Sequence, residues 1–112
     1  MAEEFEARAS DSKRAIRTVD RTETVLRCLA SFDDSVTLAD LAEEVAVTET
    51  AKPITALSGD YIKDVYLALY HAEIPFLVDQ SVVAYDQETD RVAIQPGIDI
   101  EQYIGDIRSP NR

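Results

Sequence analysis

The feature of this sequence that most constrains its fold is a change in the spacing of apolar residues near position 81. Before it, apolar residues recur every three or four positions, which is the spacing of the buried face of an amphipathic helix. After it, the segments 82–86 and 91–95 are β-branched and roughly alternating, which predicts two strands joined by residues 87–90. The sequence therefore predicts helices first and a β-hairpin after them.

Three helices are expected in the first part of the chain. They run from about Arg14 to the turn at Asp33-Asp34-Ser35, from residue 38 to 46, and from about 60 to 80. Thr37 is the expected N-cap of the second helix, since its hydroxyl can accept a hydrogen bond from the first turn. Residues 48–59 contain Pro53 and Gly59 and are expected to form a polar connection, either a loop or an insertion.

The third helix is the longest and contains a proline. Its expected core positions are Ile62, Val65, Leu69, Ala72 and Leu77. Pro75 lacks a backbone donor and clashes with the carbonyl of His71, so a kink is expected there. Cys28 falls within the apolar pattern of the first helix, which predicts a small buried side chain rather than a reactive thiol.

The two ends of the chain differ from each other. Residues 1–13 are polar and aperiodic, which predicts a disordered arm. Residues 98–112 are expected to form a short C-terminal helix and a tail, with Ile100, Tyr103, Ile104 and Ile107 at helical spacing. Residues 14–97 then form one domain with the order helix, helix, helix, hairpin. This order is the outline of an α+β winged helix, in which the hairpin covers the helical core and its turn projects as the wing.

The charge balance is strongly acidic. The chain has 22 Asp and Glu residues against 11 Lys and Arg residues, a formal net charge of −11. Such a surface is typical of proteins that work in high salt, where screening over a few ångströms weakens self-repulsion. The excess falls in residues 28–112, because residues 1–27 carry equal numbers of acids and bases. Acidic proteins are ordinarily poor partners for nucleic acid, so we interpret the charge as an adaptation to the solvent.

The sequence also indicates where the protein works. No apolar stretch is long enough to span a membrane, and residues 1–6 are acidic where a signal peptide would be basic. The single cysteine cannot form an internal disulfide. These features predict a cytoplasmic protein without a membrane partner.

One segment resembles a known family. Residues 65–86 read VYLALYHAEIPFLVDQSVVAYD and are similar to the signature V-Y-x-x-L-Y-H-x-H-L-P-x-L-x-x-x-G-V-V-x-Y-D of a haloarchaeal family of small winged-helix domains of unknown function. Residues 36–45 resemble its second helix, and residues 21–29 resemble a reduced form of its arginine-rich first helix. The resemblance covers about residues 19–95.

The resemblance implies a winged-helix fold and, by analogy, DNA binding and transcriptional regulation. Three positions depart from the family pattern. Glu73 stands where the family has its second histidine. Phe76 stands where the family often has a basic residue, and Ser81 where it usually has a glycine. These departures reduce the positive charge available for DNA.

The candidate DNA-contacting residues come from three places. They are Lys63, Tyr66, Tyr70 and His71 of the third helix, Arg91 beside the hairpin turn, and Arg14, Arg17 and Arg21 of the first helix. The last three are spaced i, i+3 and i+7, which predicts one basic stripe. The alternative is a solvated helix face with ion pairs to Asp11 and Asp20. For the tyrosines, the alternative is partial burial against a neighbouring helix or subunit.

Catalysis and metal binding are not expected. His71 is the single histidine, and the sequence places no second ligand, nucleophile or acid beside it, so it is expected to pack and hydrogen-bond near the proline. No phosphate-cradling glycine loop is present, because the glycines are scattered. The sequence therefore predicts a protein that is not an enzyme and carries no cofactor.

Two functions remain open at this point. The first is a homodimeric regulator of transcription that places helix 60–80 in the major groove of double-stranded DNA and the 86–91 turn on its backbone. The second is a winged helix without DNA contacts that serves as a protein-interaction or dimerisation module. The second is suggested by the acidic third helix and by more apolar residues than a monomer needs to bury, which would leave some of them on the surface: Leu67, Ile74, Phe76 and the C-terminal stripe.

Overall fold

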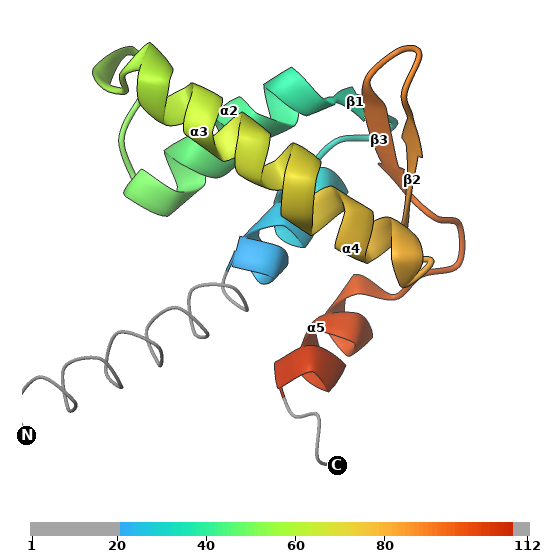
Figure 1. The fold of residues 1–112 in the computed structure, drawn as a ribbon. Coiled ribbons are helices and arrows are strands. Elements are labelled where there is room, and N and C mark those ends of the chain that lie inside the picture. The colour runs from blue at the N-terminus through green and yellow to red at the C-terminus, as the bar shows by residue number, and fades with distance from the viewer. Residues whose placement is uncertain (1–20, 109–112) are drawn as a thin grey trace, which may run out of the picture.

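The computed structural model describes residues 21–108 of the chain. The expected arm at 1–13, the expected start of the first helix at Arg14, and the last four residues lie outside this range. Within it the chain has an α+β fold (Figure 1). A helix over residues 21–30 is followed by β1 (Val36–Thr37), α2 (Leu38–Thr50), a 3₁₀ turn (Ile54–Ala56), α3 (Gly59–Ala68), a π-turn (Leu69–Glu73), α4 (Ile74–Asp79), β2 (Val83–Asp86), β3 (Arg91–Ile94) and α5 (Ile100–Arg108).

The predicted hairpin is confirmed, and a strand that the sequence did not predict joins it. The sheet has the order β1-β3-β2, with both neighbouring pairs antiparallel. Val92 of β3 lies opposite Val36 on one side and Tyr85 on the other. With only two residues, β1 is too short to show a period of two, so it is recognised only through its pairing with β3.

The second helix is longer than predicted. Thr37 is its N-cap as expected, since its Oγ1 accepts a hydrogen bond of 3.2 Å from the Asp40 N–H. The helix ends at Thr50, where Ala51 takes the left-handed conformation and donates to the carbonyl of Val47. The prediction of an irregular connection from residue 48 was therefore wrong for its first turn, whose polar side chains hid its helical character.

The third helix of the prediction is one rod in space with an irregular centre (Figure 1). The π-turn before Pro75 accommodates the proline. Its wider backbone turn avoids the clash between the proline ring and the preceding carbonyl, and the N–H donor that proline lacks is not needed there. The extra residue shifts the buried face. As a result Ala72 is exposed, against the prediction, while Glu73 and Ile74 are buried. The expectation of Ile74 on the surface was also wrong.

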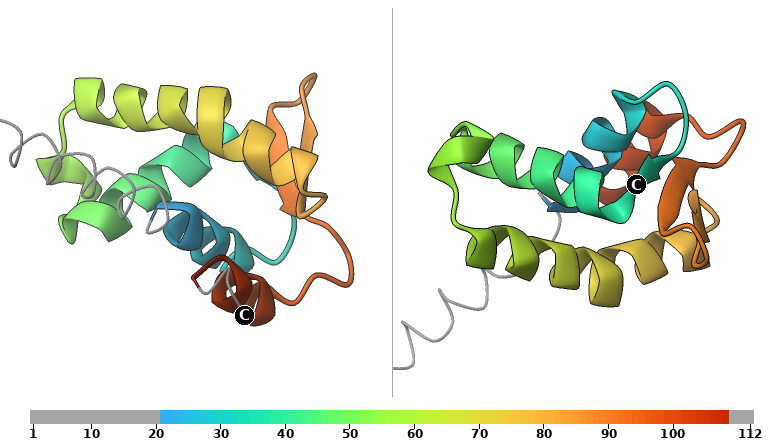
Figure 2. Two further views of the ribbon diagram at one scale, coloured as in Figure 1. Left: turned by 60° about the horizontal axis from the view of Figure 1, so that its bottom comes forward. Right: turned by 90° about the horizontal axis from the view of Figure 1, so that it is seen from above.

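The core lies between the helix at 21–30, α2, the α3–α4 rod and the inner face of the sheet, with α5 beside the first helix (Figure 2). Cys28 is buried, as predicted. The C-terminal helix is confirmed and buries Ile104. Within residues 21–108, no helix is both long and apolar enough to cross a bilayer.

Candidate nucleic-acid interface

The outward face of α3 is exposed and carries mixed charge. Ser58 caps the helix by accepting a hydrogen bond of 3.0 Å from the Tyr61 N–H, which fixes where this face begins. Lys63 stands on it between Asp60 and Asp64, and all three side chains are exposed. Lys63 makes no ion pair with any residue in the described part of the chain. It is therefore the cation of α3 that is available to an external anion.

Two tyrosines join the α3 rod to the hairpin through one carboxylate. The Tyr66 hydroxyl donates to Asp90 Oδ2 over 3.0 Å, and the Tyr85 hydroxyl donates to Asp90 Oδ1. Both contacts raise the pKa of the tyrosines, because a phenolate would face the Asp90 carboxylate. Asp90 has a φ of 55°, in the left-handed region. The turn of the hairpin is thus held against α3, and the two hydroxyls are already occupied.

Tyr70 and His71 continue this aromatic cluster along the rod. The Tyr70 ring is stacked with Tyr66 and meets Tyr85 edge-on, with 6.4 Å between ring centroids in each pair. His71 is exposed and lies edge-on to Tyr70 at 5.0 Å. With Tyr85 and Gln87 of the hairpin, Tyr70 and His71 help to line a groove of about 410 Å³ that has no carboxylate. The aromatic groove is a neutral part of an otherwise acidic face.

Arg91 is the first residue of β3, directly after the hairpin turn, and is engaged there. Its Nε donates to Ser35 Oγ over 2.8 Å, and its Nη2 donates to the Ser35 carbonyl over 2.9 Å. Ser35 belongs to the loop that leads into β1. Arg91 therefore ties this loop to β3, and a contact with DNA would compete with these hydrogen bonds.

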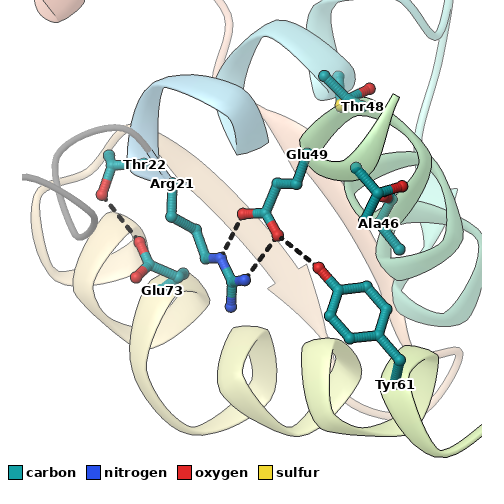
Figure 3. Close-up of polar contacts among 9 residues, drawn as sticks. Arg21, Thr22, Ala46, Thr48, Glu49, Tyr61 and Glu73 are labelled. Carbon is teal, nitrogen blue, oxygen red and sulfur yellow. Dashed lines mark hydrogen bonds and ion pairs between the residues drawn. The ribbon is translucent and has the colours of Figure 1, made fainter. Parts of the chain in front are cut away.

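Arg21 is engaged on another part of the molecule (Figure 3). It forms a two-point contact with Glu49 at the end of α2, with both N···O distances 2.6 Å. The Tyr61 hydroxyl donates to the same carboxylate over 3.3 Å. The contact raises the pKa of Arg21, since the guanidinium is hydrogen-bonded to a negative group.

Glu73, where the resemblance leads us to expect a histidine, is buried beside this network. The Thr22 hydroxyl donates to Glu73 Oε1 over 2.8 Å, as Figure 3 shows. Burial raises the pKa of the Glu73 carboxyl, and the Thr22 hydrogen bond and the charge of Arg21 partly oppose that rise. The departure from the family signature therefore joins the first helix to the π-turn.

The structure brings only some of the predicted residues together. Lys63, Tyr66, Tyr70 and His71 share the α3–hairpin surface, which we call the hairpin face. Arg21 and Arg91 have separate partners, and Arg14 and Arg17 lie outside the described residues. Sequence reasoning missed the partners Asp90, Ser35 and Glu49. Only Glu73 carried a signal, because it departs from the family pattern.

The described chain is thus an α+β domain in which an exposed helix and a β-hairpin share one face. It belongs to the protein family described as "Domain of unknown function (DUF7344)", whose match extends over residues 16–93. The match includes the helices up to α4 and most of the hairpin, and it stops before α5. Comparison with curated proteins and with solved structures gave no match.

Proposed function

We propose that this chain is a winged-helix DNA-binding protein that regulates transcription as a cytoplasmic homodimer in a halophilic archaeon, without catalytic activity. The observation that supports it is the fixed juxtaposition of an exposed helix and a hairpin. α2 and α3 follow each other as two packed helices, and Asp90 holds the hairpin turn against the outer helix. A helix of this kind fits the major groove, while an adjacent hairpin reaches the backbone.

In this proposal the contacts are divided among few side chains. Lys63 reaches a phosphate, and His71 and Tyr70 meet base edges or sugars from the aromatic groove. Tyr66 has a positioning role, since its hydroxyl is held by Asp90. Arg14 and Arg17 add phosphate contacts from the first helix, in agreement with the basic stripe in the sequence.

The acidic neighbours of Lys63 give the proposal an unusual salt dependence. Asp60 and Asp64 share the exposed face with Lys63, so this surface repels DNA at low ionic strength. At 1 M salt the screening length falls to about 3 Å, and the repulsion is largely removed. We therefore expect affinity for DNA to increase between about 0.1 M and 1 M KCl, opposite to the behaviour of a basic DNA-binding protein.

Fluorescence anisotropy with a pool of labelled genomic fragments tests this function across that range of KCl. We expect saturable binding in molar KCl that Lys63→Gln weakens about tenfold, which is the loss of roughly one charged contact. Lys52→Gln is the matched control, since Lys52 is also exposed and lies in the turn after α2. Absence of binding at every KCl concentration would rule out the proposed function.

A second candidate, a protein-interaction module, is supported by a separate observation. Leu67, Phe76 and Val78 are 38%, 47% and 42% exposed on the α3–α4 rod. Because both candidates allow a homodimer, the DNA-binding measurement distinguishes them, and sedimentation velocity of wild type and Phe76→Asp tests whether this apolar surface mediates association. If the protein is an interaction module, the wild type self-associates or binds a partner through this surface without DNA. Phe76→Asp then abolishes that association.

A further inference from the structure

A groove of about 690 Å³ shares no lining residue with the hairpin face. Its side chains come from the helix at 21–30, the last turn of α2, the first turn of α3 and the end of α5. The charged members are Arg21, Arg27, Arg108, Glu23 and Glu49. We call this site the arginine groove.

The arginine groove collects positive charge in an acidic domain. Residues 21–108 contain six Lys and Arg residues, and three of them line this one groove. The same range contains 17 Asp and Glu residues, of which only two line it. Glu101 of α5 also pairs with Arg27, so three carboxylates balance the three guanidinium groups, while the surrounding surface is strongly negative.

The two carboxylates hold the guanidinium groups in place. Glu23 accepts from Arg27 Nε over 2.9 Å and contacts Arg108 Nη2 over 2.6 Å, so it bridges the first helix and α5. Its side chain is only 16% exposed, whereas those of Arg27 and Arg108 are 48% and 56% exposed. A nearly covered carboxylate thus anchors two accessible cations.

Two of the three guanidinium groups, those of Arg21 and Arg108, keep donors for a ligand, whereas Arg27 is engaged through Nε with Glu23 and through Nη1 and Nη2 with Glu101. Arg108 contacts Glu23 through Nη2, and Arg21 contacts Glu49 through Nε and Nη2. A guanidinium carries several further N–H groups in a fixed planar fork, and these have no acceptor within the described residues. The Tyr61 hydroxyl is a further polar group at the α3 end of the groove.

We propose that the arginine groove binds a small anionic ligand that bears a carboxylate or phosphate group. Arginine forks recognise both groups through paired, charge-assisted hydrogen bonds. The groove volume falls within the range of small-molecule sites in proteins. Because its walls include the end of α2 and the start of α3, a bound anion contacts both helices that position the hairpin face. Binding of this ligand does not require DNA.

Isothermal titration calorimetry of the protein with inorganic phosphate, and separately with citrate, tests the site at constant ionic strength set with KCl. We expect saturable binding of at least one of the two anions, and this result also identifies the ligand class. Arg108→Gln should weaken it at least tenfold, since it removes one guanidinium while Glu23 keeps Arg27. Lys52→Gln removes the same charge from the exposed turn after α2 and should change the affinity less than twofold.

The arginine Nε–H resonances of the wild type give a second measurement that does not depend on a variant. We expect phosphate or citrate to shift the signals of Arg21, Arg27 and Arg108 and to leave that of Arg91 in place. Equal shifts of Arg91, heat signals no larger than those of KCl, or unchanged affinity in Arg108→Gln would each overturn the proposal. DNA binding is not a readout here, so failure of the DNA proposal remains a separate result.

Discussion

The hairpin face and the arginine groove use carboxylates in opposite ways. On the hairpin face, Asp90 accepts from two neutral tyrosine hydroxyls, so its negative charge remains on the surface. In the arginine groove, Glu23 and Glu49 pair with guanidinium groups, so their charge is neutralised and three cations are gathered. The net charge of the chain predicts neither arrangement. Local potential depends on which side chains the fold brings together.

The two regions also differ in how much their carboxylate contacts are expected to stabilise the fold. The contacts of Asp90 are part-buried hydrogen bonds from two neutral hydroxyl groups, and each contributes modestly to stability. The contact of Arg21 with Glu49 is a two-point, charge-assisted pair between two helices. We therefore expect loss of a carboxylate to be more costly in the groove than on the hairpin face.

The largest effect is expected at Glu49. Glu49→Ala leaves Arg21 without its two-point partner and the Tyr61 hydroxyl without its acceptor. We expect a loss of about 2 kcal/mol in the free energy of unfolding, measured by urea denaturation in constant KCl. Glu43→Ala is the control on the exposed face of α2 and should change stability by less than about 0.5 kcal/mol. Equal losses in the free energy of unfolding for Glu49→Ala and Glu43→Ala would show that the contact with Arg21 adds nothing to stability, and the proposed difference between the arginine groove and the hairpin face would then be lost.

Asp90 gives the corresponding test on the hairpin face. Asp90→Ala removes the acceptor of both tyrosines and should cost about 1.5 kcal/mol by the same measurement. Asp90→Asn keeps one oxygen and tolerates the left-handed backbone, so its loss should be smaller. A larger loss in Asp90→Ala than in Glu49→Ala would reverse the expected order.

The tyrosines report on the same carboxylate. Their folded-state pKa lies above the unfolded value, so their contribution to stability is present below about pH 10 and is lost as the pH rises further. Absorbance at 295 nm should show Tyr66 and Tyr85 ionising late in the wild type and in the ordinary range in Asp90→Ala. Unchanged titration in the variant would argue against the hydrogen bonds to Asp90.

Glu73 should show a gain in stability instead of a loss. Burial raises its folded-state pKa above the unfolded value, so the wild type becomes more stable as the pH falls through the titration range of this carboxyl. Glu73→Gln keeps an oxygen for Thr22 and removes the buried charge. We expect it to be about 1 kcal/mol more stable than the wild type at pH 7, with the difference vanishing in acid. A variant that is less stable at pH 7 would show that attraction to Arg21 outweighs burial.

The smallest effect is expected at Tyr103, on the helix that supplies Arg108 to the groove. Its hydroxyl is buried without a hydrogen-bond partner in the described part of the chain, and burial raises the pKa of the phenol. Tyr103→Phe should therefore increase the free energy of unfolding by about 0.5 kcal/mol. Tyr61→Phe is the matched control and should decrease it, since the Tyr61 hydroxyl has an acceptor. A decrease in both variants would show that Tyr103 has a partner after all.

Much of the fold was predictable because its signals are local. Thr37 as the N-cap, the hairpin strands around residues 87–90, and the stripe that buries Ile104 each depend on spacings of a few residues. The errors at Ala72 and Ile74 share one cause. A π-turn inserts a residue into the helical repeat, and a fixed period of 3.6 then assigns the wrong face.

The candidate sites were less predictable, because their contacts join distant parts of the chain. Arg21 and Glu49 are 28 residues apart, and Thr22 and Glu73 are 51 apart. The sequence showed Arg21 as a cation and Glu73 as a departure from a family pattern, without showing what either contacts. It gave no sign that Arg27 and Arg108 would meet at Glu23.

The sequence by itself determined the order of helices and strands, the caps and the buried apolar faces, because these follow from the chemistry of neighbouring residues. The tertiary structure alone decided the pairing of β1 with β3, the burial of Glu73 and the division of charged groups between two faces. The physical reason is that a hydrogen bond or ion pair needs two groups within a few ångströms of each other. Only the packed arrangement of helices and hairpin sets that distance for residues far apart in the chain.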